Sequence, residues 1–251
     1  MSGHSHWAKI KRSKASTDAR RGKVWSKLAR RIIVAAKTGG GKPDENLSLR
    51  YAIDDAKAAN MPNDTIDRAI KKGTGELGEV QYEKILYEGY GPGGVAFLAE
   101  CLTDNRHRTA PEIRKVFERA GGQLGAAGCV GWMFEQKGSF VIAADKADED
   151  TLMEVALEAG ADDVRAEGDV FTVTCPVAGY STVKAALAGR KIETISSQIA
   201  MLPKTTVAVT ADKAQQVLNL MEALEEHDDV QNVYANFDIP DSVLAEIGRQ
   251  D

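Results

Sequence analysis

Apolar residues recur at helical spacing near the start of the chain. Between residues 20 and 37 they fall within about 140° of a helical wheel, and cations fill the other side. The apolar set is Val24, Trp25, Leu28, Ala29, Ile32, Ala35 and Ala36, and the cationic set is Arg20, Lys23, Lys27, Arg30, Arg31 and Lys37. Two residues break the pattern, because Arg21 falls on the apolar side and Val34 among the cations. The pattern predicts an amphipathic helix that buries one side.

Two further helices are predicted before residue 80. The glycine-rich segment 38–44 ends the first helix. A second helix then runs to near Asn60, with Asp44 or Asn46 as its N-cap. A third covers residues 64–72, with Asn63 or Asp64 as N-cap and Gly73 at its end. Three helices joined by short links indicate a small helical domain.

The pattern changes to strands after residue 79. The stretch KILYEGYGPGGVAFLAECL predicts two strands joined by a Gly/Pro turn. A helix follows, with Pro111 in its first turn. Residues 133–205 alternate strand, helix, strand, helix, strand, and a further strand, helix and strand follow. This alternation predicts an α+β fold in which helices cover one face of small sheets.

The order of these elements predicts three domains. A hairpin plus one helix, at residues 81–120, is too small to fold alone, and the C-terminal strands and helix supply what it lacks. We therefore expect a basic helical domain at 1–79 and a discontinuous α+β domain at 80–132 plus 206–240. Residues 133–205 form an α+β domain inserted into the second.

Charge is distributed unevenly between the two parts of the chain. Residues 1–80 carry 17 Lys/Arg and 9 Asp/Glu, a net +8, whereas residues 81–251 carry 15 and 28, a net −13, which together give the −5 of the whole chain. Within residues 7–31 there are ten Lys or Arg and one acid, Asp18. Cations that repel one another do not stabilise a fold, so this cluster indicates a polyanionic partner.

Nucleic acid is the polyanion that this cluster fits best, because Lys and Arg that neutralise phosphates release condensed counterions. A solvated helix face and an anionic membrane surface are the weaker alternatives. Trp7 either stacks on an unpaired base or anchors the arm to its own domain. The predicted nucleic-acid-binding residues are Trp7, Lys9, Lys11, Arg12, Lys14, Arg20, Arg21, Lys23, Lys27, Arg30, Arg31, Lys71 and Lys72. For Arg106, His107 and Arg108 we favour pairing with the acidic surface over contact with RNA.

No arrangement of residues predicts an enzyme, a metal site or a cofactor. GYGPGG at 89–94 fits a dinucleotide-binding pattern, but a strand rather than a helix follows it, so we interpret it as a hairpin turn. Cys101 and Cys175 fall in predicted strands and are expected to be buried and inert. With no CxxC pair, no secretory signal and no long apolar run, we expect a cytoplasmic protein that does not enter the membrane.

Several long segments, in order along the chain, resemble one family. They are GHSHWAKIKRSKASTDARRGKVWSKL, AAKTGGGKPDENLSLR, LYEGYGPGGVAFLAECLTDNRHRT and DDVQNVYAN. The chain is similar over nearly its whole length to the YebC/PmpR family of probable transcriptional regulatory proteins. The resemblance implies a helical N-terminal domain followed by two α+β domains, one inserted in the other.

The resemblance also implies a function in nucleic-acid binding. Bacterial relatives are described as DNA-binding regulators, which is the function we predict for this chain. A mitochondrial relative is described as a translational activator, so the alternative is a translation factor that associates with the ribosome and binds ribosomal RNA or tRNA.

Overall fold

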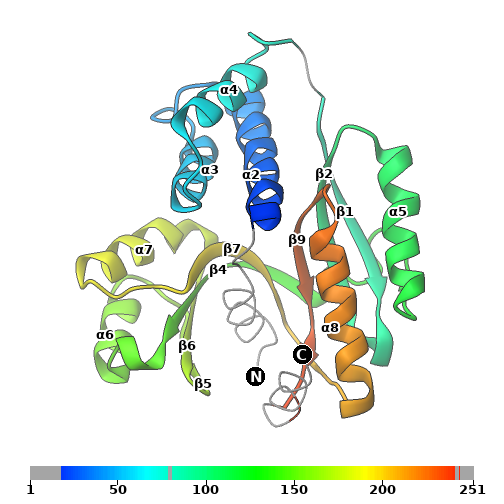
Figure 1. Ribbon diagram of the computed structural model, residues 1–251. Coiled ribbons are helices and arrows are strands. Elements are labelled where there is room, and N and C mark those ends of the chain that lie inside the picture. Colours follow the sequence, from blue (N-terminus) through cyan, green and yellow to red (C-terminus); the bar gives the residue numbers. More distant parts are fainter. Residues whose placement is uncertain (1–17, 79–80, 241–242, 244–251) are drawn as a thin grey trace.

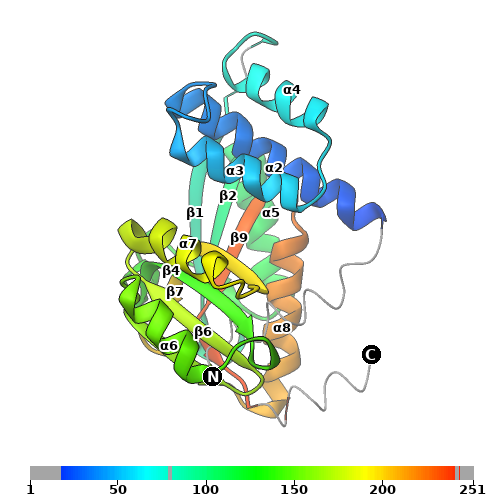
Figure 2. The same ribbon diagram turned by 90° about the vertical axis from the view of Figure 1, so that its left-hand side faces the viewer.

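A computed structural model describes residues 18–78, 81–240 and 243, with side chains from residue 22 onward. The fold is α+β, as predicted (Figure 1). A group of three helices lies beside two four-stranded sheets, each of which is covered by two helices (Figures 1 and 2).

The N-terminal helices are α2 (Asp18–Gly39), α3 (Leu47–Ala58) and α4 (Asn63–Gly73). They enclose an apolar cluster of their own, and Leu28, Ile32 and Ala36 of α2 are buried there as the helical spacing predicted. The indole Nε1–H of Trp25 donates a 2.9 Å hydrogen bond to the carbonyl oxygen of Ala59 at the end of α3. Val24 is the exception on the predicted apolar side, because it is exposed.

Helix boundaries confirm one predicted cap and correct two other details. The Asn46 side chain accepts a hydrogen bond from the Leu49 N–H and begins α3. Helix α4 begins after Pro62 and has no side-chain cap, so neither Asn63 nor Asp64 caps it. Helix α5 (Arg106–Arg119) begins earlier than predicted, because Asn105 accepts from the Arg108 N–H. Pro111 consequently lies inside this helix, not in its first turn.

The first sheet has the order β3-β1-β2-β9, with α5 and α8 (Ala211–Glu226) on one face (Figure 1). Its strands are β1 (Glu83–Tyr90), β2 (Ala96–Thr103), β3 (Gln123–Leu124) and β9 (Val230–Ala235). β1 and β2 form the predicted antiparallel hairpin. Its turn contains Gly93 at φ 72°, which confirms that GYGPGG is a turn.

The second sheet has the order β5-β6-β4-β7 and is covered by α6 (Glu149–Glu158) and α7 (Tyr180–Gly189). Its strands are β4 (Phe134–Ala143), β5 (Asp163–Glu167), β6 (Val170–Cys175) and β7 (Ser196–Pro203). Strand β8 (Val207–Ala208) lies within the strand predicted after residue 204 and pairs in parallel with β10 (Phe237–Asp238). Strands β3 and β5 and the separate strand β10 were not predicted. They are too short or too polar to show an alternating pattern.

Strand β2 joins the two sheets through its alternating side chains. Phe97, Ala99 and Cys101 face α5 and α8, whereas Ala96 and Leu98 pack with Phe134, Ala200 and Tyr234 of the strands that follow. Because β9 follows the second sheet in sequence yet pairs with β2, we propose the division already predicted, at 1–79, 80–132 plus 206–240, and 133–205. The cluster that contains Ala96, Leu98, Phe134 and Ala200 thus includes residues of both sheets.

Candidate nucleic-acid interface

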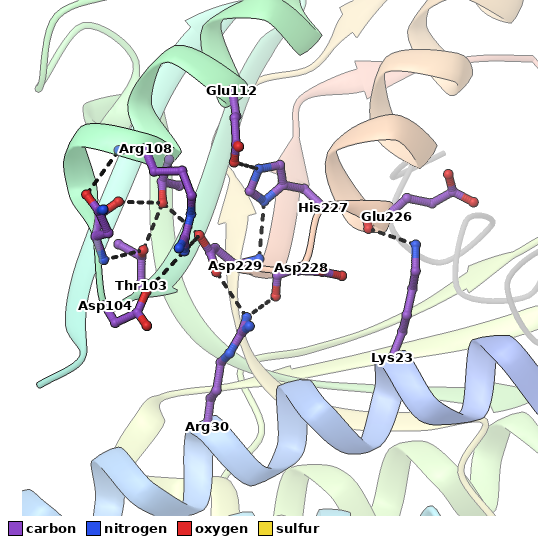
Figure 3. Close-up of polar contacts among 12 residues, drawn as sticks. Lys23, Arg30, Thr103, Asp104, Arg108, Glu112, Glu226, His227, Asp228 and Asp229 are labelled. Carbon is purple, nitrogen blue, oxygen red and sulfur yellow. Dashed lines mark hydrogen bonds and ion pairs between the residues drawn. The ribbon is translucent and has the colours of Figure 1, made fainter. Parts of the chain in front are cut away.

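The basic side of α2 lies against the C-terminal end of α8 and the turn into β9 (Figure 3). Lys23 Nζ donates to the carbonyl oxygen of Glu226 at 3.4 Å, and Lys27 Nζ donates to that of Glu225. Arg30 Nη1 donates to the carbonyl oxygen of Asp228 and lies 3.2 Å from Oδ1 of Asp229. Three predicted phosphate-binding cations therefore contact acceptors of their own chain.

The chemistry of the α8 terminus explains this contact. The last carbonyl groups of a helix lack intrahelical donors and carry the negative end of the helix dipole. Helix α8 has no basic residue in its last turn, and Glu222, Glu225 and Glu226 add negative charge near its end. Cations from α2 supply the positive charge that the last turn of α8 lacks.

Asp229 is the centre of the polar network in Figure 3, and its side chain is 4% exposed. Its Oδ2 accepts hydrogen bonds from the Thr109 hydroxyl at 2.7 Å and from Arg108 Nη2 at 3.0 Å, while Oδ1 faces Arg30. Burial by itself raises the pKa of Asp229. The hydrogen bonds from Thr109 and Arg108 and the charges of Arg30 and Arg108 outweigh burial, and the pKa lies below its ordinary value.

His227 fixes the turn that presents Asp229. Its Nδ1 accepts from the Asp229 backbone N–H at 3.2 Å, and its Nε2 lies 3.1 Å from Oε2 of Glu112 in α5. The neutral tautomer that satisfies both contacts has its N–H at Nε2, and this N–H donates a hydrogen bond to Glu112. The turn is thus held by α5 on one side and by α2 on the other.

The other predicted residues are distributed more widely. Arg31 forms an ion pair with Asp55 of α3 at 3.0 Å. Lys71 is exposed and Lys72 half-buried at the end of α4, away from the α8 contact. Arg20 and Arg21 belong to α2, but their side chains are not described. Trp7, Lys9, Lys11, Arg12 and Lys14 lie outside the described residues.

The acceptors at the end of α8 were not predicted from the sequence. The run EALEEHDD at 222–229 was visible as an acidic stretch, but nothing in it indicated contact with residues 23–30, about 200 positions away. Arg108 does pair with acids, namely Asp104 at 3.1 Å and Asp229, in line with the favoured interpretation. The helix dipole of α8 was the signal that could have indicated a need for cations.

The described residues include two buried cysteines and no converging set of metal ligands. Cys101 and Cys175 are buried, as predicted, and burial raises the pKa of Cys101 to about 12, so its thiol is not a ready nucleophile. Within residues 18–78 and 81–240, no three His, Cys, Asp or Glu side chains converge as metal ligands. None of the described helices combines the length and the apolarity needed to cross a bilayer.

Comparison with known proteins identifies relatives over almost the entire chain. The family description "TACO1/YebC protein N-terminal domain" matches residues 5–76, and "TACO1/YebC second and third domain" matches residues 82–237. A "Probable transcriptional regulatory protein" of Pelotomaculum thermopropionicum is 55% identical, covering 96% of this chain and 100% of that one. One with the same description from Syntrophobacter fumaroxidans is 56% identical, covering 98% and 100%.

A solved structure is also similar. The crystal structure of a conserved hypothetical protein, Aq1575, from Aquifex aeolicus aligns with a TM-score of 0.84 at 48% identity, covering 94% of this chain and 97% of that one. The likeness therefore extends to the arrangement of all three groups of elements.

Proposed function

Because the chain belongs to the TACO1/YebC family, we propose that it is a cytoplasmic transcriptional regulatory protein that binds DNA through its N-terminal helical domain. The relatives are named probable transcriptional regulatory proteins, which supports the regulatory part of this proposal. The observation that carries DNA binding is the charge distribution, with ten cations and one acid in residues 7–31 of an otherwise acidic chain.

Phosphate contacts position a protein on DNA, and contacts to base edges give sequence specificity. The cations of the N-terminal domain serve the first purpose. The helices of this domain bury their apolar sides in one cluster, and Lys23, Lys27, Arg30 and Arg31 of α2 lie outside it. We therefore expect an affinity for DNA that depends strongly on salt concentration and only modestly on DNA sequence.

Binding of a short labelled duplex, followed by fluorescence anisotropy across a salt series, tests this proposal. With about six phosphates contacted, the logarithm of the association constant should fall against the logarithm of salt with a slope of roughly −5. Changing Lys9, Lys11 and Lys14 to Gln should make the slope shallower by about 2.7, because three phosphate contacts are lost.

A matched control removes the same charge from the same domain. Lys42, Arg50 and Lys57 are exposed and lie outside the predicted set, so changing all three to Gln should leave the slope nearly unchanged. Equal losses in both triple variants would show that net charge alone matters. Retention on ribosomes with no affinity for duplex DNA would reject the DNA proposal in favour of the translation alternative.

A further inference from the structure

The cations of α2 are already engaged by acceptors of their own chain. In the structure, Lys23 and Lys27 donate to carbonyl oxygens at the end of α8. Arg30 donates to the carbonyl oxygen of Asp228 in the turn that follows and also faces the Asp229 carboxylate. Phosphate oxygens are acceptors of the same kind and would compete for the same cationic groups, which lie against α8 and the turn that follows it. The Arg30 side chain is only 21% exposed while it is docked. A phosphate can therefore reach it fully only after α2 leaves α8.

The contact between the N-terminal helices and the first sheet is polar. The buried apolar residues of the N-terminal helices form a cluster that includes no described residue of α8 or β9. Polar contacts between separately packed units permit relative motion, whereas the shared apolar cluster between the two sheets opposes it. The N-terminal helices thus have their own core, and their contact with α8 and the turn into β9 consists of ion pairs and hydrogen bonds.

A second contact fastens the same helices to α7 and to the core beneath it, against which Tyr51 packs. Tyr51 of α3 hydrogen-bonds to Ser181, and its ring meets that of Tyr180 edge-on at 5.8 Å between centroids. The connection to β1 contains Gly75 and Gly78 at φ values of 88° and 95°. These positive φ angles are readily adopted by glycine and let the chain turn sharply between α4 and the sheet.

We propose that the end of α8, together with Asp228 and Asp229, is an internal substitute for phosphate that holds the N-terminal domain in a self-inhibited position. Nucleic acid and this acidic end compete for Lys23, Lys27 and Arg30, so full binding requires the N-terminal domain to undock. The inference rests on the proposed function. The measured affinity is the intrinsic affinity reduced by the fraction of molecules that are undocked.

A reversible crosslink between α3 and α7, called the lock, tests this competition without removing any cation. Tyr51→Cys and Ser181→Cys, in a full-length chain that also carries Cys129→Ser, are joined by a short bismaleimide with a reducible spacer. The remaining cysteines, Cys101 and Cys175, are fully buried. The lock holds the N-terminal helices near α7 and hence keeps α2 against α8.

The locked protein should bind the labelled duplex on the order of ten-fold more weakly than the same protein after reduction. Its salt slope should be shallower by about 2.7, because three cations stay with α8. Equal affinity and equal slope before and after reduction would overturn the inference. If the reduced protein itself shows no salt-dependent binding, the proposed function fails instead, so the two failures are distinguishable.

A second variant opens the contact from the other side. Asp229→Asn removes the charge that faces Arg30 and leaves every cation of α2 in place. Provided that circular dichroism shows a folded chain, duplex binding should become several-fold tighter. Weaker or unchanged binding by the folded variant would count against competition.

Discussion

Helices α2 and α5 both carry several cations, and the structure uses them differently. Lys23, Lys27 and Arg30 of α2 are docked on the end of α8 and on the turn into β9. The side chains of Arg114, Lys115 and Arg119 in α5 are exposed and make no hydrogen bond or ion pair with any other residue that the structure describes. Glu112 and Glu118 are interspersed among them, as on an ordinary solvated face. An exposed cation is therefore not by itself a binding residue, and a docked one is not excluded from binding.

The largest expected effect is a difference in duplex binding between charge-reversal variants of α2 and of α5. Changing Lys23, Lys27 and Arg30 to Glu should remove most duplex binding and also release α2 from α8, because repulsion replaces three contacts at one helix end. Hydrogen exchange of the backbone amides at 227–229 reports release, and anisotropy reports binding. Arg114, Lys115 and Arg119 changed to Glu provide the control with the same change in charge. If the α5 variant loses binding to the same extent, the α2 surface has no special role.

Asp229→Asn should lower the free energy of unfolding by about 1 to 3 kcal/mol, because a buried acceptor loses part of its interaction with Arg108, Thr109 and Arg30. Denaturant titration measures this change. Asp228→Asn is the matched control, since Arg30 contacts only the carbonyl oxygen of that residue. A comparable loss in the Asp228 variant would contradict the importance of the Asp229 carboxylate.

The same carboxylate predicts a dependence on pH. The pKa of folded Asp229 lies below its ordinary value, so its charge stabilises the folded state at pH values above the unfolded pKa of about 3.9. This contribution is lost as pH falls through the folded pKa. The stability difference between the parent and Asp229→Asn should therefore be constant above about pH 5 and shrink below pH 4. A difference that grows on acidification would contradict this sign.

A substitution at Glu88 provides a comparison at a site that takes no part in the contact between α2 and α8. Its buried carboxylate accepts hydrogen bonds from the backbone N–H groups of Gly128, Val130 and Gly131, at 2.7 to 2.8 Å. Glu88→Gln replaces one acceptor oxygen with a donor and should cost about 1 to 3 kcal/mol of stability without changing the salt slope of binding. Glu83→Gln, at an exposed position of the same strand, should be nearly neutral in thermal unfolding.

The smallest effect concerns Trp25. Trp25→Phe keeps most of the apolar surface and loses the hydrogen bond to Ala59, which should lower stability by about 1 kcal/mol. Chemical denaturation of the parent and variant measures the difference. A loss of several kcal/mol would instead mean that the indole has a larger packing role between α2 and α3.

The order of helices and the first hairpin could be predicted because their signals are local. Helical spacing placed Leu28, Ile32 and Ala36 in the core, and the glycine and proline turn placed β1 beside β2. A strand was predicted around β8, but the short strands β3 and β10 could not be predicted, because two residues carry no periodicity and their pairing depends on distant partners.

The sequence by itself determined that cations gather near the N-terminus and acids elsewhere, because charge is a property of each residue. Only the tertiary structure decided which of them meet. Lys23, Lys27 and Arg30 reach acceptors about 200 residues away because strand β9 pairs with β2 and brings the end of α8 beside α2. Backbone carbonyl groups at a helix end have no letter in the sequence, so this contact appears only once the helices are placed.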